Sequence, residues 1–582
     1  MSCGKVYSHF PTPTDAQHGR VKVKSSAEQQ EAQKKERARR LEVYRNVAKS
    51  VLQKRKDRQF DQQALDLTGQ ILSSNPDQGS FWNFRREIFL ALEQEKSESE
   101  LQDLYQTELS FLEGCLRVNP KSYGTWHHRC WVMDRQRSPD WARELELCAQ
   151  CLQQDERNFH CWDYRRFVAL RGSVPPEDEL DFTHRLISSN FSNYSSWHYR
   201  SKLLPLVWPD PEGKGLVSEE ALLREYRLVQ NAFFTDPNDQ SAWFYHRWLL
   251  GRAERPESLS CLYADFIEQR LVVVFSRPVH VAPGEIRLSL RVDNRPVSGD
   301  WTPADGHNTY CSVWLCELPG ERWTLSSRIR QFVSPGARST RAKSANCLDR
   351  VRGEGWCQDS ATDGQLFQND LSVQKATVLE AELKSCKQLQ ELEPQNKWCL
   401  LTIVLLLRAL DPLGSEQETL TYFQRLAQAD PIRAAYFADL RSHFLVQNAI
   451  LKMEYAEARV IDLAHKDLTT LCHLDQLLLV THLDLSGNRL RRLPSAFRAL
   501  QCLQVLQADG NEIEKIEGLS KLPKLEEVSL RENRLGELDD LQPLTSCPRL
   551  RSLLLTGNPL CLGAEAGSHV RSLLPGPDNI LT

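Results

Sequence analysis

The segment NPKSYGTWHHR, residues 119–129, decides how the chain folds. It opens with the dipeptide Asn119-Pro120 and continues into an aromatic and basic run that contains Trp126 and Arg129. Proline cannot continue a helix but fits the first turn of the next one, so this dipeptide predicts the boundary between two helices. Both parts of the segment recur along the chain, and the segment is therefore one unit of an internal repeat.

Five tryptophans mark the repeat at intervals of 35 to 46 residues: Trp82, Trp126, Trp162, Trp197 and Trp243. An Asn or Asp stands seven positions before each of them: Asn75, Asn119, Asp155, Asn190 and Asp236. Three positions after the first four tryptophans is an arginine, and the fifth unit has a histidine there: Arg85, Arg129, Arg165, Arg200 and His246. The Asx residue is expected to end one helix and cap the next, and the tryptophan to anchor the second helix. The pattern predicts stacked helical hairpins.

A different pattern occupies residues 265–357. Short runs of alternating or β-branched residues are separated by Pro, Gly, Asn and Asp turns, as in 271–275, 286–292 and 312–316. This is typical of a small all-β domain of sandwich type. Helical periodicity returns from Leu366, where Glu393-Pro394 precedes Trp398 by a shorter offset and Asp430-Pro431 precedes Tyr436. The β domain is therefore predicted to be an insertion within the helical array.

The C-terminal part of the chain carries a second repeat. Four leucine-rich units follow the pattern L-x-x-L-x-L-x-x-N-x-L, with the asparagine at Asn488, Asn511, Asn533 and Asn558, and a weaker first unit has Lys466 in that place. Their spacing of 22 to 25 residues is that of leucine-rich repeats. Each asparagine side chain is expected to satisfy backbone groups after a short parallel strand.

The predicted fold is multidomain and mainly α: a superhelix of helical hairpins with an inserted β-sandwich and a C-terminal leucine-rich-repeat domain. A length of 582 residues fits this organisation, at roughly 150 residues per domain. The predicted parts are a disordered leader, the first helical array, the β insert, the continued helical array and the leucine-rich repeats, at residues 1–19, 20–264, 265–357, 358–451 and 452–582. Residues 20–58 are strongly basic and predict a long solvated helix, with a patch for an acidic partner as the alternative.

Composition excludes several classes of function. The net charge of −4 gives no overall electrostatic footprint for nucleic acid. The longest apolar run, residues 398–407, is about half the length that crosses a bilayer. The N-terminus has no apolar signal core, so the chain is expected to be cytoplasmic. The 17 cysteines are then expected to be reduced and to pack as small apolar residues.

The segment at residues 119–129 and the segment RNFHCWDYRR at residues 157–166 closely resemble the repeat of the protein prenyltransferase α-subunit family. The resemblance covers about residues 60–250 and 366–445. An immunoglobulin-like insert and C-terminal leucine-rich repeats resemble the members of this family that act on Rab GTPases. The resemblance implies a non-autonomous subunit, which wraps as a helical crescent around a separate catalytic β subunit.

The same resemblance implies a reaction and its partners. The heterodimer would transfer the geranylgeranyl group from geranylgeranyl diphosphate to C-terminal cysteines of a Rab GTPase that an escort protein presents. The β subunit would hold a zinc ion and the isoprenoid pocket, and no metal is expected in this chain. The α chain would contribute residues at the rim of the pocket.

The resemblance also implies the residues of that rim. Lys121 and His160 occupy positions that approach the isoprenoid diphosphate, where cationic and hydrogen-bond donors stabilise the departing charge. Positions that shape or support the site are Tyr123, Arg129, Asn158 and Trp162. Phe159 stands where the farnesyltransferase pattern has tyrosine, so one hydroxyl donor is missing.

Each of these residues also has a structural explanation. Trp162 and Arg129 recur in nearly every repeat, so they can serve packing and a bond between turns, and Asn158 can be a helix cap. A scaffold that binds proteins without any chemistry is the alternative function, although a tetratricopeptide solenoid would keep a near-constant period of about 34 residues. The α subunit of farnesyltransferase is a third interpretation, and the insert and the leucine-rich repeats argue against it.

Overall fold

The computed structural model describes residues 16–17, 20–21, 27–211, 217–251, 259–280, 288–292, 295–297, 301–306, 310–317, 329–333, 343–344, 347–349, 353–358, 376–453, 459–563 and 565–582. It contains two compact units, Met1–Val207 and Trp208–Thr582, which are described separately. Among the described residues, no helix combines the length and the apolar character that crossing a bilayer requires.

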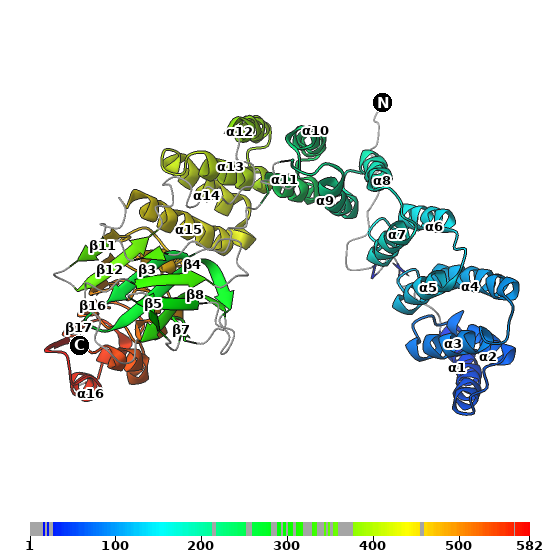
Figure 1. Ribbon diagram of the computed structural model, residues 1–582, viewed down its shortest axis with the longest axis horizontal. Helices are drawn as coiled ribbons and strands as arrows, with labels where there is room; N and C mark the ends of the chain where they lie inside the picture. Colours follow the sequence, from blue (N-terminus) through cyan, green and yellow to red (C-terminus); the bar gives the residue numbers. More distant parts are fainter. Residues whose placement is uncertain are drawn as a thin grey trace. The chain divides into compact units, whose positions relative to one another are not determined.

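The first unit is an array of helices (Figure 1). They are α1 (Ala27–Lys56), α2 (Gln62–Leu72), α3 (Gly79–Leu92), α4 (Glu98–Val118), α5 (Tyr123–Arg135), α6 (Trp141–Gln154), α7 (Phe159–Arg171), α8 (Pro176–Ser189) and α9 (Tyr194–Val207). Helices α4 and α5, α6 and α7, and α8 and α9 pack as pairs, which confirms the helical hairpins. The predicted basic helix is α1. The strands β1 (Ala16–Gln17) and β2 (Arg20–Val21) pair before it, and the rest of the predicted leader lies outside the described residues.

The fixed distance between Asx and tryptophan has a direct structural cause. Each indole nitrogen donates a hydrogen bond of 2.7 to 2.8 Å to the backbone carbonyl six positions earlier, which belongs to the residue after the Asx: Pro76, Pro120, Glu156, Phe191 and Pro237. In four of the turns the Asx residue ends the first helix of its hairpin: Asn119, Asp155, Asn190 and Asp236. A different residue caps the second helix, as Ser122 does for α5 and Asn158 for α7. The Asx residue therefore does not perform both roles that the sequence suggested.

The recurring arginines hold neighbouring helices together. Three of them each form two hydrogen bonds with a buried glutamate of the next helix: Arg85 with Glu108, Arg129 with Glu144, and Arg165 with Glu179. The recurring arginines also donate to the backbone carbonyl twenty positions earlier, at Leu65, Leu109, Leu145 and Leu180. One guanidinium thus links its own helix to the helices before and after it, which satisfies the polar groups that the stacking buries.

The second unit continues the repeat on both sides of the insert. Its helices are α10 (Glu219–Thr235), α11 (Gln240–Leu250), α12 (Ala376–Leu392), α13 (Lys397–Leu410), α14 (Glu416–Ala429) and α15 (Ala434–Lys452). The distance of seven residues from the turn residue to the buried anchor is the same here, but the anchors are not tryptophans. Leu400 stands seven positions after Glu393, and Phe437 stands seven after Asp430; both are buried. Trp398 and Tyr436, the aromatics that the sequence pointed to, are not the anchors.

The insert contains two antiparallel sheets in the residues that the structure describes. The strands are β3 (Leu259–Asp265), β4 (Arg270–His280), β5 (Leu288–Val292), β6 (Arg295–Val297), β7 (Trp301–Pro303), β8 (Tyr310–Glu317), β9 (Ile329–Val333), β10 (Lys343–Ser344), β11 (Cys347–Asp349) and β12 (Glu354–Gln358). The sheet orders are β11-β12-β3-β4-β8-β7 and β10-β9-β5-β6. The first strand begins at Leu259, ahead of the predicted boundary at residue 265.

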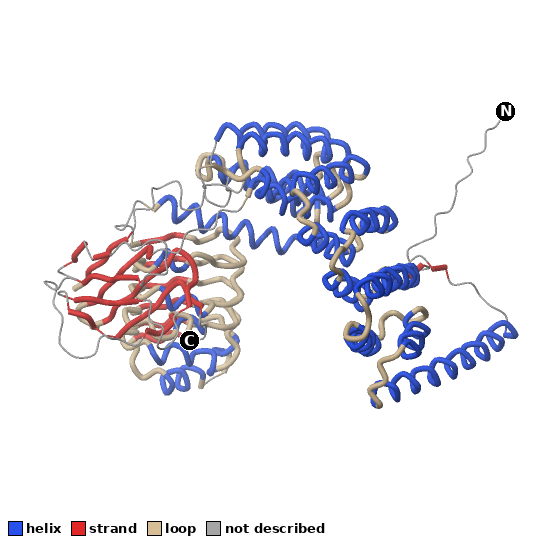
Figure 2. Tube along the Cα trace, turned by 45° about the vertical axis from the view of Figure 1, so that its right-hand side comes forward, coloured by secondary structure: helices blue, strands red, loops and turns tan. Residues whose placement is uncertain are grey.

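The leucine-rich repeats form one parallel sheet in the order β13 to β18. Its strands are β13 (Val460–Asp462), β14 (His482–Asp484), β15 (Val505–Gln507), β16 (Glu527–Ser529), β17 (Ser552–Leu554) and β18 (Asn579–Leu581). Short 3-10 helices follow most strands, and α16 (Ala566–Leu573) precedes the last strand. Asn488 behaves as predicted: its amide donates to the carbonyls of Leu463 and Leu485, and its oxygen accepts from the N–H of Leu468. Figure 2 marks the strands of the insert and of this sheet in red.

The insert and the leucine-rich repeats share a core. Side chains from β3, β4 and β8, including Tyr263 and Val272, pack in one buried cluster with Leu478 and Cys502 of the repeats. Lys524 is buried beside this cluster. Its ammonium lies 2.7 Å from Asp265, 2.5 Å from Glu354 and 2.7 Å from the Tyr263 hydroxyl, all of the insert. The two parts are therefore joined by apolar packing and by a buried ion cluster.

Candidate functional site

The turn that starts α5 and the turn that starts α7 lie side by side and form a rim. Ser122 caps α5, and Asn158 caps α7 by accepting hydrogen bonds from the backbone N–H groups of His160 and Cys161. The amide nitrogen of Asn158 also donates to the carbonyl of Pro120, at 2.9 Å. This bond fixes the first turn against the second. Both helix starts carry the positive end of the helix dipole, which favours an anion nearby.

Lys121 stands at the exposed edge of the rim. Its ammonium lies 3.0 Å from the carboxylate of Asp155, which ends α6. Partial burial raises the pKa of Asp155, but the hydrogen bonds from Lys121 and from the N–H of Arg157 outweigh this and hold the pKa below its usual range. Asp155 is therefore an anion at neutral pH, paired with a side chain that remains 60% exposed.

His160 is a buried member of the rim. The ring centroid of Tyr123 lies 4.1 Å from that of the imidazole, in an edge-on arrangement. The ring centroid of Phe159 lies 3.9 Å from that of the imidazole, and the two rings are tilted. Burial lowers the pKa of His160; Asp163 opposes this shift and Lys121 reinforces it. The imidazole is therefore neutral at neutral pH, and one of its ring nitrogens carries a proton that it can donate.

Arg129 and Trp162 lie in the interior of the helical array. Arg129 is fully buried and forms bonds of 2.6 and 2.7 Å with Glu144, and burial and this pairing act in opposite directions on its pKa, which is raised overall. Trp162 is 3% exposed and donates to the carbonyl of Glu156. Both residues hold the helices that carry the rim, and neither reaches its surface.

The structure thus divides the predicted site residues into two groups. Lys121, Tyr123, Asn158 and His160 come together at the rim, whereas Arg129 and Trp162 support it from the core. Sequence reasoning missed the role of Asp155, which it treated only as a turn residue. A signal for it exists, since Asp155 carries a charge where the turns before and after it have Asn119 and Asn190.

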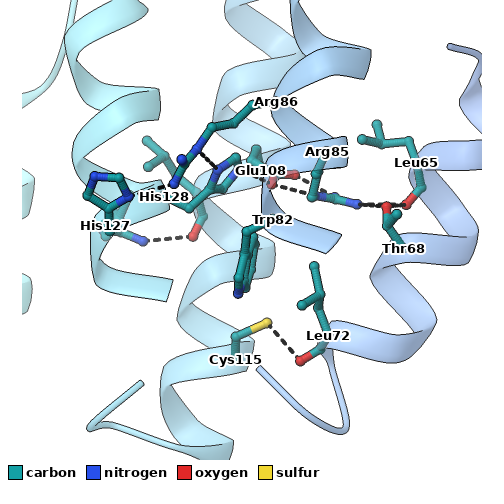
Figure 3. A network of polar contacts seen from close by, with 12 residues as sticks. Leu65, Thr68, Leu72, Trp82, Arg85, Arg86, Glu108, Cys115, His127 and His128 are labelled. Carbon is teal, nitrogen blue, oxygen red and sulfur yellow. Dashed lines mark hydrogen bonds and ion pairs between the residues drawn. The ribbon is translucent and has the colours of Figure 1, made fainter. Parts of the chain in front are cut away.

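A second polar cluster joins α3, α4 and α5 around His127 and His128 (Figure 3). His128 is fully buried and lies 2.9 Å from Glu108, which also binds Arg85. Arg86 lies 2.8 Å from Nδ1 of His127 and 3.2 Å from Nδ1 of His128. Because a guanidinium only donates, each of these nitrogens acts as an acceptor. His128 is therefore a core residue. No group of three or more His, Cys, Asp or Glu residues that could hold a metal ion is found in the described part of the chain.

Three family models match parts of the chain. The model described as "Protein prenyltransferase alpha subunit repeat" matches residues 105–136, 141–171, 176–206 and 222–253. The model "Rab geranylgeranyl transferase alpha-subunit, insert domain" matches residues 259–361. A leucine-rich-repeat model matches residues 472–571. The rim formed by α5 and α7 therefore belongs to the prenyltransferase repeats.

Similar proteins extend over nearly the whole chain. The protein named geranylgeranyl transferase type-2 subunit alpha of Bos taurus is 57% identical, over 97% of this chain and 100% of its own length. The protein of the same name from Homo sapiens is 56% identical over the same shares. The one from Schizosaccharomyces pombe is 35% identical, over 53% of this chain and 92% of its own length. Because relatives at this level of identity match the chain over their full length, the chain belongs to the geranylgeranyl transferase type-2 α-subunit family.

Proposed function

We propose that this chain is the α subunit of a heterodimeric geranylgeranyl transferase, active only together with a catalytic β subunit. The enzyme transfers geranylgeranyl from geranylgeranyl diphosphate to C-terminal cysteines of Rab GTPases, which an escort protein presents, in the cytoplasm. The observation that carries this proposal is the end-to-end match with relatives named as type-2 α subunits, at 56 to 57% identity. The name of the matched insert model, which includes Rab, supports the acceptor.

The rim of α5 and α7 suits the diphosphate of this donor. When a cysteine sulfur attacks the first carbon of the isoprenoid, the bond from that carbon to oxygen breaks and negative charge builds on the diphosphate. The ammonium of Lys121 and the N–H of the His160 imidazole can hold this charge, as donors fixed at a developing anion do in other enzymes. The N-termini of α5 and α7 add positive potential at the same place.

Zinc is proposed on the β subunit, where it would hold the acceptor cysteine as a thiolate. This chain contributes the groups that receive the leaving diphosphate. Asn158 holds the two turns together, and Tyr123 and Phe159 pack against the imidazole of His160.

The same edge of the array is proposed to contact the β subunit. Exposed aromatic residues stand at the first position of three successive second helices: Tyr123 of α5, Phe159 of α7 and Tyr194 of α9. They are 71%, 53% and 48% exposed. Aromatic side chains are enriched in the buried centre of protein interfaces, and a row of them next to the diphosphate rim would bring that rim to the partner's lipid pocket.

The insert and the leucine-rich repeats are proposed to be dispensable for the transfer itself. Lys121, Tyr123, Asn158 and His160 all lie on the helical repeats, before the first strand of the insert. The Schizosaccharomyces pombe relative, which has the same name, is matched over 92% of its length by only 53% of this chain. Its sequence therefore has no room for all the parts present here.

The test is transfer of labelled geranylgeranyl to a Rab GTPase with its escort protein. Three samples are compared: this chain alone, the β subunit alone, and the two co-expressed. Activity is expected only in the co-expressed sample. No activity, together with no stable complex between the two chains, would favour a scaffold that binds proteins without chemistry.

A further inference from the structure

The turn that contains Asp155 differs in charge from the turns before and after it. In those turns an asparagine uses its oxygen to accept the N–H two positions later, as Asn119 does from Lys121 and Asn190 from Ser192. Its amide nitrogen then donates to a carboxylate of the preceding turn: Asn119 to Asp77 at 2.8 Å, and Asn190 to Glu156 at 2.7 Å.

At Asp155 this polarity is reversed. One carboxylate oxygen accepts the N–H of Arg157 at 3.1 Å, so the backbone turn is the same as in the neighbours. The other oxygen lies 3.0 Å from the ammonium of Lys121, which belongs to the preceding turn. The turn itself needs no charge here, since asparagine makes it elsewhere. The negative charge of Asp155 therefore serves the ion pair with Lys121 and not the turn.

We infer that Asp155 is a positioning residue for Lys121, which it holds at the rim so that the ammonium faces the leaving diphosphate. This inference rests on the proposed function. An ammonium has three N–H donors, and the contact with Asp155 uses one of them, which leaves two for phosphate oxygens. A free lysine side chain has many rotamers, and the ion pair selects among them before the substrate binds.

The charge of Asp155 also predicts a particular kinetic effect. A carboxylate beside the lysine weakens the attraction of the rim for the anionic substrate, while it improves the orientation of the ammonium. Loss of the charge is therefore expected to lower kcat and to leave the KM for geranylgeranyl diphosphate unchanged or lower. A general loss of folded protein would reduce the amount of active enzyme and would not lower KM.

The test uses the heterodimer with a Rab GTPase and its escort protein, and the variant Asp155→Asn. Asparagine preserves the turn, as at Asn119 and Asn190, and removes only the ion pair. The expected result is a five- to fiftyfold lower kcat with no increase in KM. The matched control is Asp236→Asn, the same substitution in the turn between α10 and α11. In the turn before that one, Ser192 stands at the position that Lys121 has in the turn before Asp155. This control is expected to leave kcat within twofold.

A double-mutant cycle with Lys121→Ala separates the positioning role of Asp155 from the proposed function of the rim. If Asp155 acts through Lys121, Asp155→Asn lowers kcat in the native background but changes it less than twofold in the Lys121→Ala background. A large loss with Lys121→Ala and none with Asp155→Asn would overturn the positioning role and leave the proposed function intact. Equal effects of Asp155→Asn in both backgrounds would also overturn it. Unchanged turnover with Lys121→Ala would remove the rim from the reaction and the inference with it.

Discussion

The imidazole of His246 lies 2.8 Å from the carboxylate of Glu382, although the whole β insert separates the two residues in the sequence. His246 occupies the repeat position that holds arginine in the first four units, and Glu382 lies on α12, the first helix after the insert. The pair thus reproduces the bond between an arginine and the glutamate of the next helix. The helical array continues through the insertion as if the inserted residues were a long loop.

His246→Ala should destabilise the second unit by about 3 kcal/mol, because it removes the partner of one oxygen of the buried Glu382 carboxylate. Gln230 also donates to Glu382, at 2.8 Å. Urea unfolding of the full chain measures the loss. His184→Ala, at an exposed position on α8, is the control and should change stability by less than about 0.5 kcal/mol. Equal stabilities of the two variants would mean that the pair does not hold the array together.

Lys121→Ala should lower turnover of the heterodimer by about ten- to a thousandfold, as loss of one donor to a developing anion does elsewhere. The side chain is 60% exposed, so folding should be unaffected. Steady-state transfer of labelled geranylgeranyl and a thermal melting curve give the two readouts. Lys384→Ala, an exposed lysine of α12, is the matched control and should have native turnover.

Lys524→Ala should destabilise the insert and the leucine-rich repeats together. The substitution leaves Asp265 and Glu354 buried without their shared cation, which costs about 3 to 5 kcal/mol. Hydrogen exchange read by mass spectrometry should increase in β3, β12 and the adjoining repeats at once. Arg571→Ala, an exposed residue of α16, serves as the control. Increased exchange in only one of the two parts would contradict a shared core.

Acid should weaken the first unit through His128 and Glu108. Burial lowers the pKa of His128 from 6.5, and Arg85 and Arg86 add to this while Glu108 opposes it. Burial raises the pKa of Glu108, but Arg85 and His128 outweigh it and bring the pKa to about 2. In both cases the unfolded chain binds protons that the folded chain does not.

The sign follows from these two directions. The contribution of His128 is complete above about pH 6.5 and decreases below it, and the contribution of Glu108 decreases as pH falls from about 4.5 towards 2. The melting temperature of the chain should therefore fall from pH 7.5 to pH 5. His128→Gln should lower the melting temperature at pH 7.5 and reduce its slope between pH 7 and 5. A slope equal to that of the native chain would exclude His128 as its source.

Much of the helical fold could be predicted from the sequence because the bond that defines each repeat joins residues only six positions apart. The tryptophan bonds to a carbonyl six positions away, so its spacing from the Asx residue is visible in the sequence itself. The predicted anchor residues were wrong in the units after the insert, where apolar packing alone preserves the repeat. Leu400 and Phe437 fill the anchor position without an indole nitrogen. The sequence pattern pointed to the nearby aromatic residues Trp398 and Tyr436 instead.

The candidate site was predictable in part for a related reason. Resemblance to a family motif pointed to Lys121 and His160, and the structure places both on one rim. The pairing with Asp155 depends on which turns stack, and that is a contact between repeats. The bonds of Lys524 with the insert are more remote still, since they join segments 170 and 261 residues apart. A single sequence contains no periodic signal for such contacts.

The bond from each tryptophan to the turn before it explains how this array tolerated a large addition. Since each of the five joints that carry a tryptophan is secured within its own seven residues, the stretch between one such joint and the next carries no fixed length. Units of 35 and 44 residues can therefore stand in one stack within the first unit. A complete domain between α11 and α12 is the extreme case of this freedom, and the seams between hairpins are the natural places to graft further modules onto such a protein.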